Sequence, residues 1–237
     1  MELQDGIGSE GAAQPPNHAS GKDHGVPTGL ATELVDRVTH RVVRHAELDA
    51  VLRHRHAAYL RSGIFAPRAD GLLRDEHDDR DDTHTVVTRL DDEIAGSLRV
   101  QILSERNMDT YTCGLFPDAV RRIVVGGTVA IDCNRATTDE AVTKRHRGFH
   151  FHALRPAMLA AAHYGAEWIL APVQERHAAF YSRGLAGRPV SDPIVAPGTE
   201  GCVALLMGMH VPSMLRRRGA RLAFMLPRRG ETDDLFG

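Results

Sequence analysis

The stretch that decides the fold is VAIDCNRATTDEAVTKRHRGFHFHALRPAMLAAA, which occupies residues 129–162. It begins with β-branched and other apolar residues that favour a strand. Polar residues at 137–140 end this strand, and a basic turn follows at 144–148. From Phe149 onward the apolar residues recur three and four positions apart, which is the spacing of a helix. The stretch therefore predicts a strand, a turn that ends in glycine, and a helix.

The junction between the basic turn and the helix has the properties of an anion site. The first turn of a helix leaves backbone N–H groups unpaired, and the helix dipole favours negative charge there. Glycine permits close approach to the backbone, and the flanking arginines add charge. A phosphate, a diphosphate or the phosphopantetheine arm of coenzyme A or of an acyl carrier protein fits such a site. The alternative is a solvated basic turn. The candidate residues are Arg145, Arg147, Gly148, Phe149 and His150.

Two motifs resemble the GNAT N-acyltransferase fold. Arg145-x-x-Gly148-x-His150 is similar to its Arg/Gln-x-x-Gly-x-Gly/Ala turn, and HAAFYSRGL at 177–185 resembles the helix and turn that close its acyl-donor site. His150 departs from the family, which usually has a small residue at this position. The resemblance implies that Tyr181 protonates the departing pantetheine thiolate, since a phenol can donate a hydrogen bond to it. The alternative for Tyr181 is a helix residue packed on the sheet.

The composition fits one domain of moderate size with additional terminal segments. With 237 residues and 42% apolar content, the chain is long enough to bury a core. The 29 basic and 31 acidic residues give a net charge of −2, which argues against nucleic-acid binding. We expect a disordered leader over residues 1–28, the main domain over 29–210, and a C-terminal helix with a loosely structured tail over 211–237.

The sequence favours a cytoplasmic protein without a membrane span. The three cysteines are odd in number and lack the spacing of a zinc or redox site. The N-terminus has no basic region followed by the apolar run of a signal peptide, and no stretch is apolar for long enough to cross a bilayer. His146 and His150 lie four residues apart, but no HExxH pattern accompanies them, so we expect no metal site.

The order of the expected elements is that of a mixed α/β protein. It lacks the strict alternation of a doubly wound sheet and agrees with the order of elements in the GNAT-like fold. The expected strands other than the central one are 35–43, 83–90, 94–103, 167–171, 189–195 and 202–209, and the other helices are 46–60, 116–123, one that begins at Ala178, and 214–224.

The N-terminal half of the chain narrows the resemblance. Four ordered segments are similar to those of the acyl-homoserine-lactone synthases and the long-chain N-acyl amino acid synthases, which share the acetyltransferase fold. The lactone synthases usually carry Glu at the position of Asp132 and a tryptophan after the first helix, whereas Trp168 is the only tryptophan here. The amino acid synthase branch, or a relative from a biosynthetic cluster, therefore fits better. The segments are Arg53-His-Arg55-x-x-x-Tyr59, Asp75-x-x-Asp78, Gly96-Ser-Leu-Arg99-Val100 and Asp132-x-x-Arg135.

The resemblance implies roles for these charged residues. An acceptor amine must be neutral to attack a thioester, so a carboxylate such as Asp132 must take a proton, directly or through water. The carboxylate of an amino acid needs a forked donor, which Arg99 or Arg135 can supply. The alternative is a salt-bridge network that only orders the long loop. The expected catalytic residues are Asp132, Arg99, Tyr181 and Arg135, and the expected substrate-binding residues are Asp75, Asp78, Arg55 and Tyr59.

The sequence therefore predicts an N-acyltransferase. It would move an acyl group from a thioester of acyl carrier protein or coenzyme A to the amine of an amino acid or related small molecule. We expect direct attack, because no Ser or Cys stands in a nucleophile setting. We also expect no permanently bound cofactor, with the acyl thioester as co-substrate. A backbone N–H near residues 136–141 would stabilise the oxyanion.

Two alternatives and one possible partner surface remain at this stage. The chain could be an acetyl-CoA-dependent small-molecule N-acetyltransferase, or a sensor that binds acyl thioesters without catalysis. The basic residues 216–218, together with Lys144 and Arg145, could meet an acidic acyl carrier protein. The alternative for these residues is a solvated basic helix.

Overall fold

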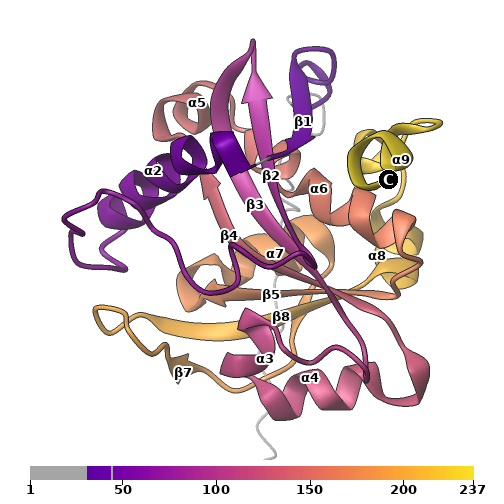
Figure 1. Cartoon of the computed structure of the whole chain (residues 1–237). Coiled ribbons are helices and arrows are strands. Elements are labelled where there is room, and N and C mark those ends of the chain that lie inside the picture. The colour runs from indigo at the N-terminus through magenta and orange to yellow at the C-terminus, as the bar shows by residue number, and fades with distance from the viewer. Residues whose placement is uncertain (1–30, 44) are drawn as a thin grey trace, which may run out of the picture.

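The computed structural model describes residues 31–43 and 45–237, which form one eight-stranded sheet flanked by helices (Figure 1). The strands hydrogen-bond in the order β1-β2-β3-β4-β5-β8-β6, and β7 also pairs with β8. The predicted mixed α/β fold is confirmed. The strands are β1 Val38–Val42, β2 Thr83–Leu90, β3 Glu93–Leu103, β4 Ala130–Thr138, β5 Trp168–Gln174, β6 Arg188–Pro189, β7 Ile194–Val195 and β8 Val203–His210.

The sheet opens between its two parallel strands. β1 to β4 are antiparallel neighbours, whereas β4 and β5 run parallel. Residues 130–132 of β4 pair with residues 168–170 of β5, and both strands then continue apart, as Figure 1 shows. The later backbone groups of β4 therefore lack a strand partner on that side, and buried backbone groups need other partners. This opening is available to a ligand.

Helices cover both faces of the sheet. α6 lies along the sheet and contacts β3, β4 and β5, while α2 and α3 also contact β4. In the described part of the chain, no helix is both long enough and apolar enough to cross a membrane. The helices are α2 His45–Arg61, α3 Tyr111–Leu115, α4 Pro117–Val124, α5 Glu140–Arg145, α6 Phe149–His163, α7 Ala178–Leu185, α8 Val211–Arg218 and α9 Glu231–Phe236.

The two faces of the sheet differ in chemistry, because successive side chains of a strand point to opposite faces. On β3, Leu98 and Val100 belong to the main apolar core, which includes most of α6. Arg99 and Gln101 alternate with them and are fully buried on the other face. There they lie opposite polar residues of β4, because Arg99 pairs with Asn134 in the strand register. A buried polar layer therefore covers one face of the central strands.

Residues 140–145 form the helix α5, whereas the sequence predicted only polar turn structure there. Asp139 is the N-cap of α5, and its side chain accepts a hydrogen bond from the Val142 N–H at 2.9 Å. This bond satisfies one of the unpaired donors at the helix start. β4 also continues to Thr138, so the predicted strand end was too early. The strand expected at 189–195 divides into the short strands β6 and β7.

The C-terminal residues pack on α6, so the expected loose tail was wrong. Arg155 of α6 donates from Nη2 to Glu231 at 2.7 Å and from Nε to the Phe224 carbonyl at 2.8 Å. Phe236 of α9 is buried against Tyr164 at the end of α6. These contacts join residues far apart in sequence, which local patterns do not report. The expected leader at 1–28 lies outside the described residues.

Candidate active site

A cavity of about 650 Å³ occupies the opening between β4 and β5. Its walls come from the end of α2 and the following loop, from residues 133–138 of β4, and from residues 172–174 of β5. Residues of α3, α5, α6, α7 and the β7–β8 connection also line it. The cavity is large enough for small-molecule substrates. Among the predicted site residues, Tyr59, Arg135, His150 and Tyr181 line it.

A bulge in β4 forms part of the cavity wall. Ser97 pairs with Thr137 and Arg99 pairs with Asn134, so residues 135 and 136 together oppose a single residue of β3. Arg135 adopts a positive φ of 52°, which is unusual for a side chain of this size. A bulge withdraws backbone groups from the ladder and redirects a side chain. Residues 135 and 136 both line the cavity, so the bulge forms part of its wall.

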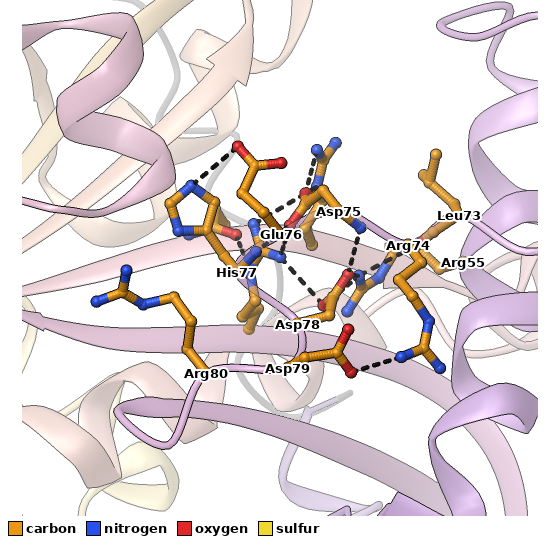
Figure 2. Close-up of polar contacts among 12 residues, drawn as sticks. Arg55, Leu73, Arg74, Asp75, Glu76, His77, Asp78, Asp79 and Arg80 are labelled. Atoms are coloured by element: carbon orange, nitrogen blue, oxygen red, sulfur yellow. Dashed lines mark hydrogen bonds and ion pairs between the residues drawn. The ribbon is translucent and has the colours of Figure 1, made fainter.

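Asp75 is the centre of the predicted ionic cluster (Figure 2). It accepts hydrogen bonds from Nη1 and Nη2 of Arg99, and from Nε and Nη2 of Arg135 at 2.9 and 2.5 Å. Burial by itself raises the pKa of Asp75, but the two guanidiniums outweigh it and hold that pKa well below its usual range. Asp75 is therefore a charged anchor that fixes both arginines, and it is a poor proton acceptor.

A second ion pair, between Arg55 and Asp78, lies next to Asp75. Arg55 Nη1 lies 2.7 Å from Asp78 Oδ1, and both side chains are fully buried. Asp78 also lies 3.1 Å from Arg99 and accepts from the Asp75 N–H at 3.0 Å. The pair thereby ties the long loop between α2 and β2 to α2, as Figure 2 shows, and the contact of Asp78 with Arg99 ties the same loop to β3. Burial lowers the pKa of Arg55, and the adjacent Asp78 partly offsets this effect.

Asp132 lies behind the cavity wall. It accepts from the N–H of Thr112 at 3.0 Å and from Asn134 Nδ2 at 2.8 Å, and it is fully buried. Asn134 Oδ1 in turn accepts from Arg99 Nε at 2.7 Å. Among the described residues, neither Asp132 nor Arg99 lines the cavity. The geometry therefore gives Asp132 no direct contact with a substrate, and it positions α3 and, through Asn134, Arg99. Its catalytic role stays a prediction.

Arg135 is surrounded by aromatic rings at the cavity wall. Its guanidinium carbon lies 4.3 Å from the centroid of Tyr111, 5.6 Å from that of Phe65 and 6.0 Å from that of Tyr59. Rings at these distances attract a cation through their quadrupoles. Tyr111 and Phe65 both line the cavity, and the sequence interpretation missed them. They come from separate loops and helices, so no sequence spacing connects them with Arg135.

Tyr181 of α7 is buried and lines the cavity. Burial raises the pKa of Tyr181, and the nearby Cys133 adds to this effect, so the phenol stays protonated at neutral pH. Within residues 31–43 and 45–237, no hydrogen-bond partner of the phenol is found. The hydroxyl is therefore available to donate to a ligand.

The predicted phosphate site is divided in the structure. Arg145 and Arg147 are exposed outside the cavity wall, and Phe149 is fully buried in the core. A Cβ on Gly148 would lie 2.7 Å from the backbone of Ala31, so this glycine permits the approach of another chain segment. His150 lines the cavity, with its ring centroid 5.9 Å from that of Phe180. The cavity wall also includes two arginines that the sequence interpretation missed, Arg61 and Arg176.

The two basic clusters do not form one surface. Figure 1 shows α5, which holds Lys144 and Arg145, on a different side of the molecule from α8, which holds residues 216–218. In the described part of the chain, no residue of α8 lines the large cavity. A carrier protein that delivers a substrate to this cavity would therefore not contact both clusters near the opening.

Comparisons with known proteins agree with this geometry. The sequence pattern of the N-acyl amino acid synthase FeeM family matches residues 50–210. The structure resembles FeeM, an N-acyl amino acid synthase from uncultured soil microbes, with a TM-score of 0.61 and 13% identity over 76% of this chain and 94% of that chain. No curated protein sequence matches at a significant level.

Two further solved structures have similar folds. TofI, solved with an inhibitor and MTA, gives a TM-score of 0.57 and 17% identity over 81% of this chain and 97% of that chain. BjaI, a CoA-dependent acyl-homoserine lactone synthase solved with MTA, gives a TM-score of 0.54 and 12% identity over 80% of this chain and 92% of that chain.

The divided sheet, the cavity between its parallel strands and these likenesses define the fold of the GNAT-type acyltransferases. Within that class, the chain belongs to the FeeM N-acyl amino acid synthase family, whose pattern covers more than half of it. The predicted resemblance and the predicted activity, acyl transfer to an amine, are confirmed.

Proposed function

We propose that this N-acyltransferase acylates the amine of an amino acid whose carboxylate binds Arg135. The free position on Arg135 is the observation that carries the proposal. Asp75 engages Nε and Nη2, while no described residue hydrogen-bonds Nη1, and the side chain lines the cavity. A carboxylate at Nη1 gains a charge-assisted hydrogen bond from a guanidinium that is already held in place.

The attack would follow from the positions of the bulge and Tyr181. The neutral amine adds to the thioester carbonyl, and the resulting oxyanion accepts a hydrogen bond from a backbone N–H at the bulge around Ala136. The carbon–sulfur bond then breaks, and Tyr181 donates its proton to the thiolate. The phenolate of Tyr181, whose conjugate acid has a raised pKa, recovers a proton from the acylated nitrogen through water. The products are an amide and a thiol, and the charges balance.

Cys133 supports direct attack over an acyl-enzyme intermediate. It lines the cavity, but burial raises the pKa of its thiol well above the usual range. A neutral thiol is a weak nucleophile, because the thiolate is the reactive form. The incoming amine therefore meets the thioester without competition from this side chain. Positioning of the two substrates supplies most of the rate enhancement.

The donor is proposed to be an acyl carrier protein. Ala31 occupies the space beside Gly148, and Arg145 and Arg147 lie outside the cavity wall, so little remains there for the diphosphate of coenzyme A. The phosphopantetheine arm of a carrier has one phosphate, and the exposed Arg176 stands on the wall of the cavity. Rates with an acyl carrier protein and with the matching acyl-CoA, measured on the purified enzyme, test this choice directly.

Mass spectrometry of lipid extracts tests the main proposal. Cells that produce the wild-type protein should accumulate N-acyl amino acids, and cells that produce Arg135→Ala should not. Arg80→Ala is the matched control, because Arg80 is partly buried and paired with the carboxylates of Asp82 and Asp109 but lies outside the cavity wall. It should keep the product as long as the protein folds.

Other outcomes separate the rival functions. Acetylated amines without longer acyl products would favour the acetyl-CoA-dependent interpretation. Binding of an acyl thioester by calorimetry, with no acylated product from any variant, would favour the sensor. Equal product from Arg135→Ala and wild type would contradict the role of Arg135 while leaving N-acyl transfer in place.

A further inference from the structure

A second, small pocket lies behind Tyr181. Its volume is about 10 Å³, which is no more than one water-sized probe occupies. The surface of the pocket is entirely apolar. An empty apolar pocket of this kind stays dry.

The small pocket adjoins the active-site cavity. Cys133, Leu154 and Tyr181 line both of them, so these side chains separate the two spaces. Tyr181 is the residue proposed above to protonate the leaving thiolate. An acyl chain attached to a carbonyl near Tyr181 therefore begins at the entrance of the small pocket.

Four methionines line the small pocket, and we call it the methionine pocket. Met158 comes from α6, Met209 from β8, Met214 from α8, and Met225 from the short 3₁₀ turn Ala223–Met225. All four are at most 4% exposed. A methionine side chain has three rotatable bonds and fills irregular space, so it can rearrange around an inserted group more easily than a branched side chain. The pocket is closed in this structure but has a deformable wall.

Two of these methionines lie beyond the part of the chain that matches the family. The family pattern ends at residue 210, whereas Met214 and Met225 follow it. Arg155 anchors the segment that carries Met225, through its hydrogen bonds to the carbonyls of Phe224 and Leu226 on either side. The C-terminal segment thus forms one wall of the pocket and is held firmly against α6.

We propose that Met214 and Met225 form the end wall of the acyl-chain site and determine the length of the acyl group that the enzyme transfers. This inference rests on the proposed acyl transfer past Tyr181. The methionine side chains of the wall move aside as the acyl chain enters, and the anchored C-terminal segment limits how far the acyl chain extends.

Product profiles of variants test the inference against the acyl pool of the producing cell. Met225→Ala and Met214→Ala should shift the main product to a longer chain, and Met225→Phe should shift it to a shorter one. Each further methylene that a widened pocket buries should raise kcat/KM about fourfold, which corresponds to about 0.8 kcal/mol. Met207→Ala is the matched control, since Met207 is fully buried on the neighbouring β8 but is not part of either pocket lining in the described structure. Met207→Ala should lower the stability of the protein without changing the length of the transferred acyl chain.

A binding measurement keeps the inference testable apart from turnover. Calorimetry with S-acyl pantetheine thioesters, from butanoyl to hexadecanoyl, should show the same change of preferred length in Met225→Ala. Acylated products with an unchanged length profile in both alanine variants would overturn the inference and leave the proposed function intact. Absence of product from every variant, together with a shifted binding preference, would overturn the proposed function and support the acyl-chain site.

Discussion

Replacement of Asp75 by Asn tests whether the ionic cluster holds the active site in shape. Asp75 accepts two hydrogen bonds from Arg99 and two from Arg135, and it is 16% exposed. Asn keeps the shape and one acceptor oxygen but removes the charge, so both guanidiniums lose their shared counterion. Removing one partner of a buried ion pair costs about 3–5 kcal/mol, and the retained oxygen and partial exposure favour the lower end, about 3 kcal/mol. We expect Asp75→Asn to lower the free energy of unfolding by this amount at pH 7.

The same substitution has a predicted pH dependence. The pKa of Asp75 is depressed in the folded protein, so its contribution to stability is complete above the pKa of the unfolded chain, about 3.9. The contribution is lost as the pH falls from there toward the folded pKa. The difference between wild type and Asp75→Asn should therefore be constant between about pH 5 and 7 and should shrink below about pH 4.

Urea unfolding at several pH values measures both effects. Asp79→Asn is the control in the same loop, because Asp79 pairs with Arg74 and both side chains are well exposed. An exposed pair of this kind contributes less than about 1 kcal/mol. A difference between wild type and Asp75→Asn that is as small as that of the control, or that does not change below pH 4, would refute the reasoning.

Three further predictions concern single side chains. Tyr181→Phe removes the proposed proton donor, so kcat should fall about 100-fold or more in a discontinuous activity assay. The hydroxyl has no hydrogen-bond partner among the described residues, so the melting temperature measured by calorimetry should change little. Asn134→Ala breaks the links to Asp132 and Arg99 and should cost about 2–3 kcal/mol in urea unfolding, because buried charged groups lose a partner. Gly148→Ala brings a methyl group within 2.7 Å of the Ala31 backbone and should cost about 1–3 kcal/mol, whereas Gly114→Ala, which has open space, should cost less than this.

Local patterns predicted most of the elements correctly. The period of the apolar residues from Phe149 onward identified α6, and the strands expected at 83–90 and 94–103 correspond to β2 and β3. Such patterns record which side of an element faces the core, and this information is complete within a short segment. The missed helix α5 is too short to show an apolar period, and its signals were the N-cap Asp139 and the i,i+4 pair of Glu140 with Lys144.

The ionic cluster shows which features of the site the motifs predicted and which they did not. The motif segments correctly pointed to charged residues that lie together, since Asp75, Asp78, Arg55, Arg99 and Arg135 form one connected group. The motifs did not report which of these side chains reach the cavity.

The sequence by itself determined the class of fold, the charged residues of the cluster and the position of Tyr181 on its helix, because these follow from periodicity and from motifs within short segments. Only the tertiary structure decided which groups line the cavity. The register of β3 on β4 and the bulge at Arg135 direct that side chain into the cavity and leave Asp132 behind the wall. Packing of distant segments fills the space beside Gly148 with Ala31 and closes the methionine pocket with the C-terminal residues. These features depend on contacts between residues far apart in the chain, so no local pattern contains them.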